Sequence, residues 1–169
     1  MIVMKYISVF LIMLCTTVYA ADPVTLSITG NIIASPCQIS SDSALINVDL
    51  GQNIQASSLF APGSATDWKS ININLTSCPA GTTKATMTMH GTADSSQPND
   101  LYQNTGTEQN VAVQLQSTGG DLLGDGKTIS GNISNGSYTF PLQARAFSKN
   151  GDAGPGTISA VVTATFVYN

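Results

Sequence analysis

The sequence predicts an all-β domain, a β-sandwich of seven or so short strands. Apolar and polar residues alternate with period two in several short segments, and turns such as Pro62-Gly63 and Gly119-Gly120 separate these segments. Charged residues make up only 9% of the chain, against about 25% in an average protein. Thr, Ser, Asn and Gly supply the polarity instead, which is typical of extracellular β proteins. No segment predicts a long helix.

The alternation places the strands along one domain, with no internal repeat and no second domain. In residues 68–76, for example, Ile71, Ile73 and Leu75 share one face and Asn72 and Asn74 share the other. Residues 93–107 and 122–136 are rich in turn-forming residues and are predicted to be loops. The predicted strands, in chain order, are 45–50, 68–76, 83–91, 111–116, 138–147 and 156–169.

The segment 156–169 is a long alternation of apolar and polar residues and is predicted to be a strand at the edge of a sheet. After Gly156, one face carries Ile158, Ala160, Val162, Ala164, Phe166 and Tyr168. An apolar edge strand recruits another strand unless something covers it. The sequence therefore raises the question of what covers this edge.

Residues 1–20 are predicted to be a signal peptide. Lys5 precedes an apolar run over 6–14, and Val18 and Ala20 are the small residues expected at positions −3 and −1 of the cleavage site. A lipoprotein signal at Cys15 is the alternative, but Leu14 occupies the position where such a signal needs a small residue. We expect cleavage after Ala20 and no direct membrane insertion of the mature chain.

Cleavage after Ala20 would remove Cys15 and leave Cys37 and Cys78. An even number of cysteines in an exported chain favours a disulfide, which here would close a loop of about 40 residues. Two free buried thiols are the alternative. A zinc site is disfavoured because the single histidine, His90, has no partner at ligand spacing.

The segment 24–32 alternates as strictly as the final strand. Val24, Leu26, Ile28, Gly30 and Ile32 fall on one face, separated by Thr, Ser and Asn. An ordinary first strand is one interpretation. The other is an arm that lies outside the packed domain, since the whole segment precedes Cys37. Gly30 suits a place where another backbone approaches closely.

The composition argues against several classes of function. A pI near 4.5 and a net charge of −4 disfavour nucleic-acid binding. One histidine and the lack of a nucleophile or phosphate-binding motif predict no enzyme and no cofactor. Asp121 and Asp125 are better explained by a turn than by a calcium site, and Trp68 by a packing role than by a sugar platform.

Several motifs together resemble the subunits of chaperone–usher fimbriae. They cover nearly all of the chain after residue 20, and the penultimate Tyr168 and the glycine at 156 stand at the family's positions. An additional Pro23 lies near the tip of the arm. The matching stretches are the arm from Val24 to Ser35-Pro-Cys37, Trp68-x-x-Ile-x-Ile-x-Leu-Thr-x-Cys-Pro, Gly106-Thr-x-Gln-Asn-Val, Phe140-Pro-Leu-Gln-Ala-Arg-Ala and Gly156-Thr-Ile-x-Ala-Val.

The resemblance implies an immunoglobulin-like sandwich that lacks its last strand, so that a groove remains beside the final strand. It divides the chain into a signal peptide (1–20), a donor-strand extension (21–34) and a pilin domain (35–169). The donor residues would be Val24, Leu26, Ile28, Gly30 and Ile32, and the acceptor groove would be formed by Gly156 and the apolar face from Ile158 to Tyr168.

The same resemblance implies where the chain works and with which partners. It would be exported through the periplasm to a fimbrium on the bacterial surface. Its partners would be a periplasmic chaperone, an outer-membrane usher, and neighbouring pilin subunits or a tip adhesin. The expected role is a structural subunit and adaptor that supports adhesion, and the alternative is a carbohydrate-binding adhesin.

Overall fold

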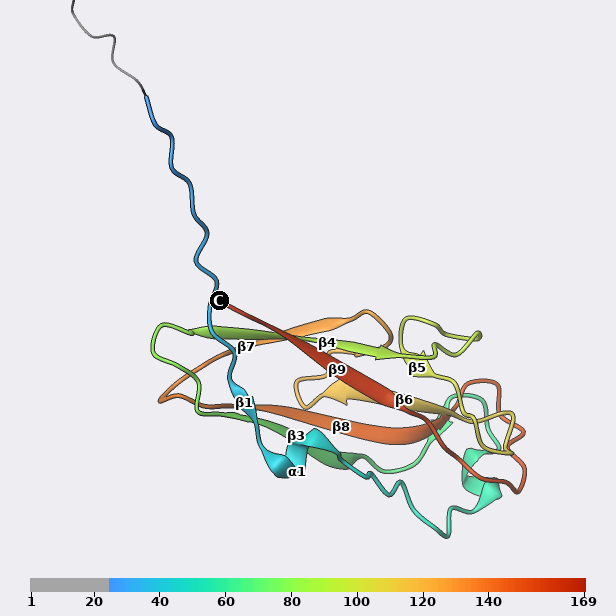
Figure 1. Ribbon diagram of the computed structural model, residues 1–169. Helices are drawn as coiled ribbons and strands as arrows, with labels where there is room; N and C mark the ends of the chain where they lie inside the picture. Colours follow the sequence, from blue (N-terminus) through green and yellow to red (C-terminus); the bar gives the residue numbers. More distant parts are fainter. Residues whose placement is uncertain (1–24) are drawn as a thin grey trace, which may run out of the picture. The chain divides into compact units, whose positions relative to one another are not determined.

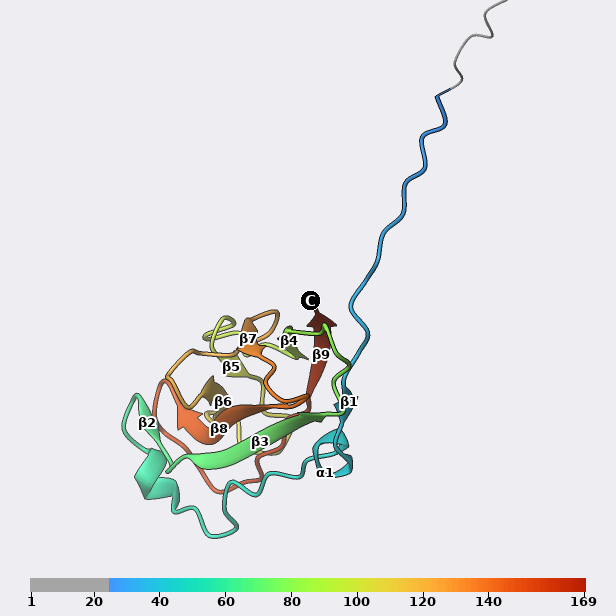
Figure 2. The same ribbon diagram turned by 90° about the vertical axis from the view of Figure 1, so that its left-hand side faces the viewer.

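The computed structural model of the chain describes residues 25–169 (Figure 1). Within the described residues, 25–31 and 32–169 form two separate units. The larger unit consists of two antiparallel β-sheets, with two short helical turns, α1 (Ser41–Ala44) and η1 (Ala56–Leu59). Figure 2 shows the sandwich, with β4, β7 and β9 in one layer above β3 and β8. The predicted signal peptide lies outside the described residues.

The two sheets differ in size. The larger sheet has the order β1-β3-β8-β6-β5, and β2 also pairs with β8; the smaller has the order β7-β4-β9. The larger sheet contains β1 (Gln38–Ile39), β2 (Ser64–Ala65), β3 (Lys69–Thr76), β5 (Leu101–Tyr102), β6 (Ala112–Ser117) and β8 (Tyr138–Ser148). The smaller sheet contains β4 (Lys84–Gly91), β7 (Thr128–Asn132) and β9 (Val162–Tyr168).

The alternating apolar side chains of both sheets meet between the layers, as the period-two pattern predicts. Leu75 on β3, Met87 on β4 and Phe140 on β8 are almost completely buried, whereas Asn72 on the outer face of β3 is exposed. The hydroxyl group of the buried Tyr102 donates a hydrogen bond to the carbonyl of Leu123 at 2.8 Å. The side chains between the sheets are therefore mainly apolar, and the buried hydroxyl group of Tyr102 has a hydrogen-bond acceptor.

A disulfide ties the start of the larger sheet together. Cys37, just before β1, bonds to Cys78, just after β3, with an S–S distance of 2.03 Å. β1 and β3 are antiparallel neighbours, with Ile39 opposite Leu75, so the bridge lies where the two strands already meet. The expected disulfide is confirmed, and the alternative of two free thiols is wrong.

Two predicted loops contain strands. The prediction for 122–136 is wrong over β7, which pairs with β4 through Ile129 opposite Met87. Gly131 obscured this strand, yet the glycine is required because a Cβ atom there would lie 1.9 Å from the Tyr138 ring. The prediction for 93–107 is wrong over β5, whose two residues are too few to show a period.

The predicted strand at 45–50 is absent, and the final strand begins later than predicted. A β-strand needs a neighbouring strand to pair with. Residues 45–50 pair with no strand among the described residues. β9 begins at Val162, not at 156, because its ladder with β4 begins with Gly91 opposite Val162. The other predicted strands are confirmed, with ends that differ by at most one residue.

The disulfide should contribute strongly to stability, because it closes a loop with a sequence separation of 41. We expect the double substitution Cys37→Ser and Cys78→Ser to lower the free energy of unfolding by about 4 kcal/mol. Urea unfolding of the chain from residue 21 onward measures this change, and reduced wild-type protein is the matched control. A loss below about 1 kcal/mol in both samples would contradict the expectation.

Candidate strand-binding groove

β9 forms an open edge of the smaller sheet. It pairs with β4 along its whole length, from Gly91 opposite Val162 to Ala85 opposite Tyr168. On its other side, β9 has no backbone hydrogen bond to any residue in 25–169. An open edge offers unpaired N–H and C=O groups to another strand.

The register with β4 determines which residues of β9 face this opening. Asn169 and Lys84 exchange both backbone hydrogen bonds, each at 3.0 Å, so they form a hydrogen-bonded pair. Such pairs alternate along an antiparallel ladder. Thr163, Thr165 and Val167 therefore point their N–H and C=O groups toward β4. The even-numbered residues of β9 point these groups away from the sheet: Val162, Ala164, Phe166 and Tyr168.

The same even-numbered residues also carry the apolar face of β9. Their side chains are partly buried against the core between the sheets, whereas Val167 on the opposite face is 61% exposed. The Phe166 ring lies 6.0 Å from the Phe140 ring and 6.4 Å from the Tyr168 ring. Partial burial raises the pKa of the Tyr168 hydroxyl group. Each of these residues thus presents an apolar side chain to the interior and an unpaired backbone to the opening.

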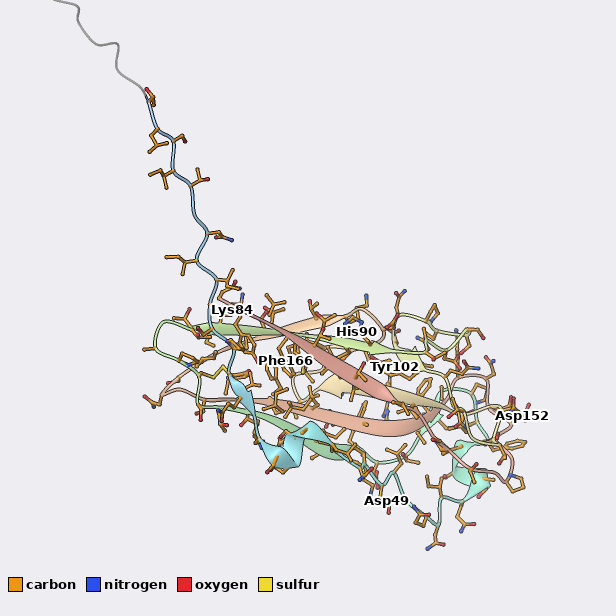
Figure 3. All side chains as sticks on the ribbon, in the orientation of Figure 1. Asp49, Lys84, His90, Tyr102, Asp152 and Phe166 are labelled. Carbon is orange, nitrogen blue, oxygen red and sulfur yellow. A yellow bond between two sulfur atoms is a disulfide. The ribbon has the colours of Figure 1, made fainter. Side chains whose placement is uncertain are left out.

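Residues 45–50, which do not form the predicted strand, lie opposite β9 and form a wall at one end of the space beside its open edge. Ile46 and Leu50 are partly buried against the core, and Val48 between them is 37% exposed. The turn that ends this wall is fixed by Asp49, whose carboxylate accepts hydrogen bonds from Gln52 and the Gly51 amide. These hydrogen bonds, the one from Gln52 above all, lower the pKa of Asp49. Figure 3 shows Asp49 in the loop after α1 and Phe166 between the sheets.

A cavity of about 520 Å³ lies between the two walls. Its sides include Ile46 and Leu50 on one wall and Ile158 and Ala160 on the other. Its floor is the apolar core of both sheets. The floor residues are Ile71, Ile73, Met89, Val113, Leu115, Leu142 and Ala144. We call the cavity and the open edge that continues from it along β9 the groove.

The structure brings together most of the predicted acceptor residues. Ile158, Ala160 and Val162 line the cavity, and Ala164, Phe166 and Tyr168 continue the same face along β9. Gly156 lies outside the groove: it packs on the loop 104–108, where an added Cβ atom would be 2.7 Å from the Glu108 nitrogen. Sequence reasoning missed the wall at 46–50, although the alternation of Ile46, Val48 and Leu50 was visible.

The described part of the predicted arm, residues 25–32, is not assigned to any strand. Leu26, Ile28 and Ile32 are 78%, 83% and 98% exposed, and no atom lies within 4 Å of a Cβ position added to Gly30. Val24 lies outside the described residues. Exposed apolar side chains in strict alternation are typical of a segment that pairs with another sheet. Among residues 25–169, no helix has the length and apolar character needed to cross a membrane.

The alternation of paired and unpaired backbone groups on β9 can be measured directly. In the dilute mature chain, we expect the amides of Ala164 and Phe166 to exchange with solvent about a hundredfold faster than those of Thr163 and Thr165. Hydrogen exchange followed by NMR gives these rates. Leu142 and Gln143 in the central β8 serve as controls, because both should be protected. Equal protection of odd and even residues in β9 would contradict an open edge.

Comparisons with known proteins agree with this geometry. A family model described as "Fimbrial protein" matches residues 26–169. The chain is 41% identical to Protein FimG of Escherichia coli (strain K12), over 90% of this chain and 89% of that protein. It is 34% identical to the S-fimbrial adhesin protein SfaS of Escherichia coli O6:K15:H31 (strain 536 / UPEC), over 85% and 84% of the two chains.

A solved structure supports the fold. The P pilus rod subunit PapA superposes with a TM-score of 0.65 at 23% identity, over 80% of this chain and all of that chain. It confirms the expected pilin-type sandwich with an immunoglobulin-like arrangement. With a matched family model over most of its length and a relative at 41% identity, the chain belongs to the fimbrial protein family.

Proposed function

We propose that the chain is a structural subunit and adaptor of a chaperone–usher pilus that polymerises by donor-strand complementation. The observation that carries this proposal is the groove: an unpaired β9 edge whose apolar face continues into an open cavity. Strand addition at an open sheet edge gives affinity through main-chain hydrogen bonds and specificity through alternate side chains.

The arm of such a subunit supplies what the groove of its neighbour lacks. Residues 24–32 carry apolar side chains at every second position, which matches the side-chain period of an added strand. Burial of Val24, Leu26, Ile28 and Ile32 would contribute roughly 1.5–3 kcal/mol each, or about 6–12 kcal/mol together. This is comparable to the whole stability of a typical domain, roughly 5–15 kcal/mol.

This role assigns a purpose to each part of the chain. Residues 1–20 direct export, 21–34 form the donor extension, and 35–169 form the pilin domain. In the periplasm, a chaperone strand occupies the groove from Ile158 to Tyr168 until an outer-membrane usher brings the next subunit, whose arm replaces it. The arm of this chain then enters the groove of another subunit or of a tip adhesin in the fimbrium at the cell surface.

The alternative of a carbohydrate-binding adhesin has one observation in its favour, the similarity to a relative whose name describes an adhesin. A sugar platform needs an open aromatic face, and Trp68 is the obvious candidate. The guanidinium group of Arg145 lies over the Trp68 ring, 4.1 Å from its centre. The occupied ring face supports a structural role for Trp68, and we favour the pilus subunit.

Refolding with an added arm peptide tests the proposal. We expect the chain without residues 21–33 to gain at least about 10 °C in melting temperature when a peptide of residues 24–33 is present, because burial in the groove adds several kcal/mol. A peptide with Leu26 and Ile28 changed to Asp is the matched control and should give no gain. Equal melting temperatures with and without the arm peptide, or glycan binding that survives loss of the arm, would contradict the proposal.

A further inference from the structure

We call the edge of the groove that an added strand would pair with, Ile158 to Tyr168, the receiving edge. It is longer than β9. Ile158 and Ala160 line the cavity, yet they lie before Val162, where the ladder with β4 begins. Something other than β4 must therefore hold this part of the edge in place. The structure provides a substitute in the loop 104–108, between β5 and β6.

This loop satisfies the backbone of Thr157 and Ser159 completely. The Thr157 N–H donates to the Thr107 hydroxyl oxygen at 2.9 Å, and its carbonyl accepts from the Glu108 N–H at 3.2 Å. The Ser159 carbonyl accepts from the Thr105 N–H at 2.8 Å. The odd-numbered residues are thus held by the loop as their counterparts in β9 are held by β4. By the same alternation, Ile158 and Ala160 direct their backbone groups to the opening.

Asn104 is the centre of this arrangement. Its side-chain nitrogen donates to the carbonyls of Glu108 at 2.7 Å and Thr157 at 3.1 Å. Its side-chain oxygen accepts from the N–H groups of Gly106 at 2.8 Å and Ser159 at 2.7 Å. The carboxamide has two donors and two acceptor sites, and all are used. The Asn104 side chain thus joins the loop to the receiving edge by one hydrogen bond on each side of Ile158, to Thr157 and to Ser159.

Two glycines and a buried carboxylate allow the loop to approach so closely. A Cβ atom on Gly106 would lie 2.1 Å from the Thr157 carbonyl oxygen, and one on Gly156 would lie 2.7 Å from the Glu108 nitrogen. Glu108 is 6% exposed, and its carboxylate accepts hydrogen bonds from the N–H groups of Asn110 and Gly154 at 3.1 and 3.0 Å. The chain leading into the receiving edge is therefore fixed from both ends.

We propose that Asn104 is a positioning residue for strand capture: it holds Ile158 and Ala160 as an extension of the β9 edge and keeps the cavity shaped for the end of the incoming strand. This inference rests on the proposed function. β9 alone offers Val162, Ala164, Phe166 and Tyr168 to an added strand, one position fewer than the alternating face of the arm 24–32. The extension held by Asn104 adds two positions, Ile158 and Ala160, so the edge is then long enough for the whole alternating face of the arm.

Binding of a labelled arm peptide to the full mature chain tests this role. The probe is a fluorescent peptide of residues 24–33, together with two variants that carry Val24→Ala or Ile32→Ala. We expect Asn104→Ala to weaken binding of the unchanged peptide about tenfold, because hydrogen bonds on both sides of Ile158 are lost. One of the two variant peptides carries its alanine at the end that enters the cavity. For that peptide, Asn104→Ala should cause little further loss of affinity, as expected for coupled sites.

The control variant is Asn74→Ala, which removes another hydrogen-bonded asparagine. Asn74 accepts from the Thr139 hydroxyl at 2.8 Å on the outer face of β3, away from the cavity lining. Thr105→Val, which removes only the 3.0 Å hydrogen bond from the Thr105 hydroxyl to the Ser159 carbonyl, provides the same readout if Asn104→Ala does not fold.

The outcomes separate this inference from the proposed function. If the wild-type chain does not bind the arm peptide, the proposed function itself fails. If the wild-type chain binds and Asn104→Ala binds equally well, the positioning role is overturned and the proposed function stands. Equal weakening of all three peptides by Asn104→Ala would also overturn it, because the residue would then act on the whole domain and not on the cavity.

Discussion

The structure depends on a coincidence of two periods along β9. In an extended strand, side chains alternate between the faces of a sheet and backbone groups alternate between its edges, both with period two. The register with β4 places the apolar side chains and the unpaired backbone groups on the same residues, including Ala164 and Phe166. A strand added at this edge therefore completes hydrogen bonding and core packing in one step.

This constraint explains why the domain is both well formed and incomplete. The larger sheet is continuous, its core residues such as Phe140 and Leu142 are almost fully buried, and the disulfide fixes its first strands. The smaller sheet leaves the inner face of β9 only partly buried over the cavity. A strand added along β9 would supply much of the remaining apolar burial, which fits the proposed role as a subunit of a fibre.

Much of the fold could be predicted because alternation is a local signal. β3, β4, β8 and the inner face of β9 follow from period two, and the disulfide follows from cysteine number and export. Three features depend on distant contacts and could not be predicted. Segment 45–50 reads as a strand but lacks a partner, β7 is hidden by a glycine that the Tyr138 ring requires, and Asn104 is an ordinary loop asparagine until the fold places Ser159 beside it.

We expect an extended strand from another molecule to complete the edge from Ile158 to Tyr168. Hydrogen exchange of the chain without residues 21–33, measured before and after saturation with the peptide of residues 24–33, tests it most directly. We expect peptide binding to protect the amides of the even-numbered residues, such as Ala160 and Ala164, and to leave the already protected Thr163 and Thr165 unchanged. Protection confined to residues outside this edge would contradict strand addition at β9.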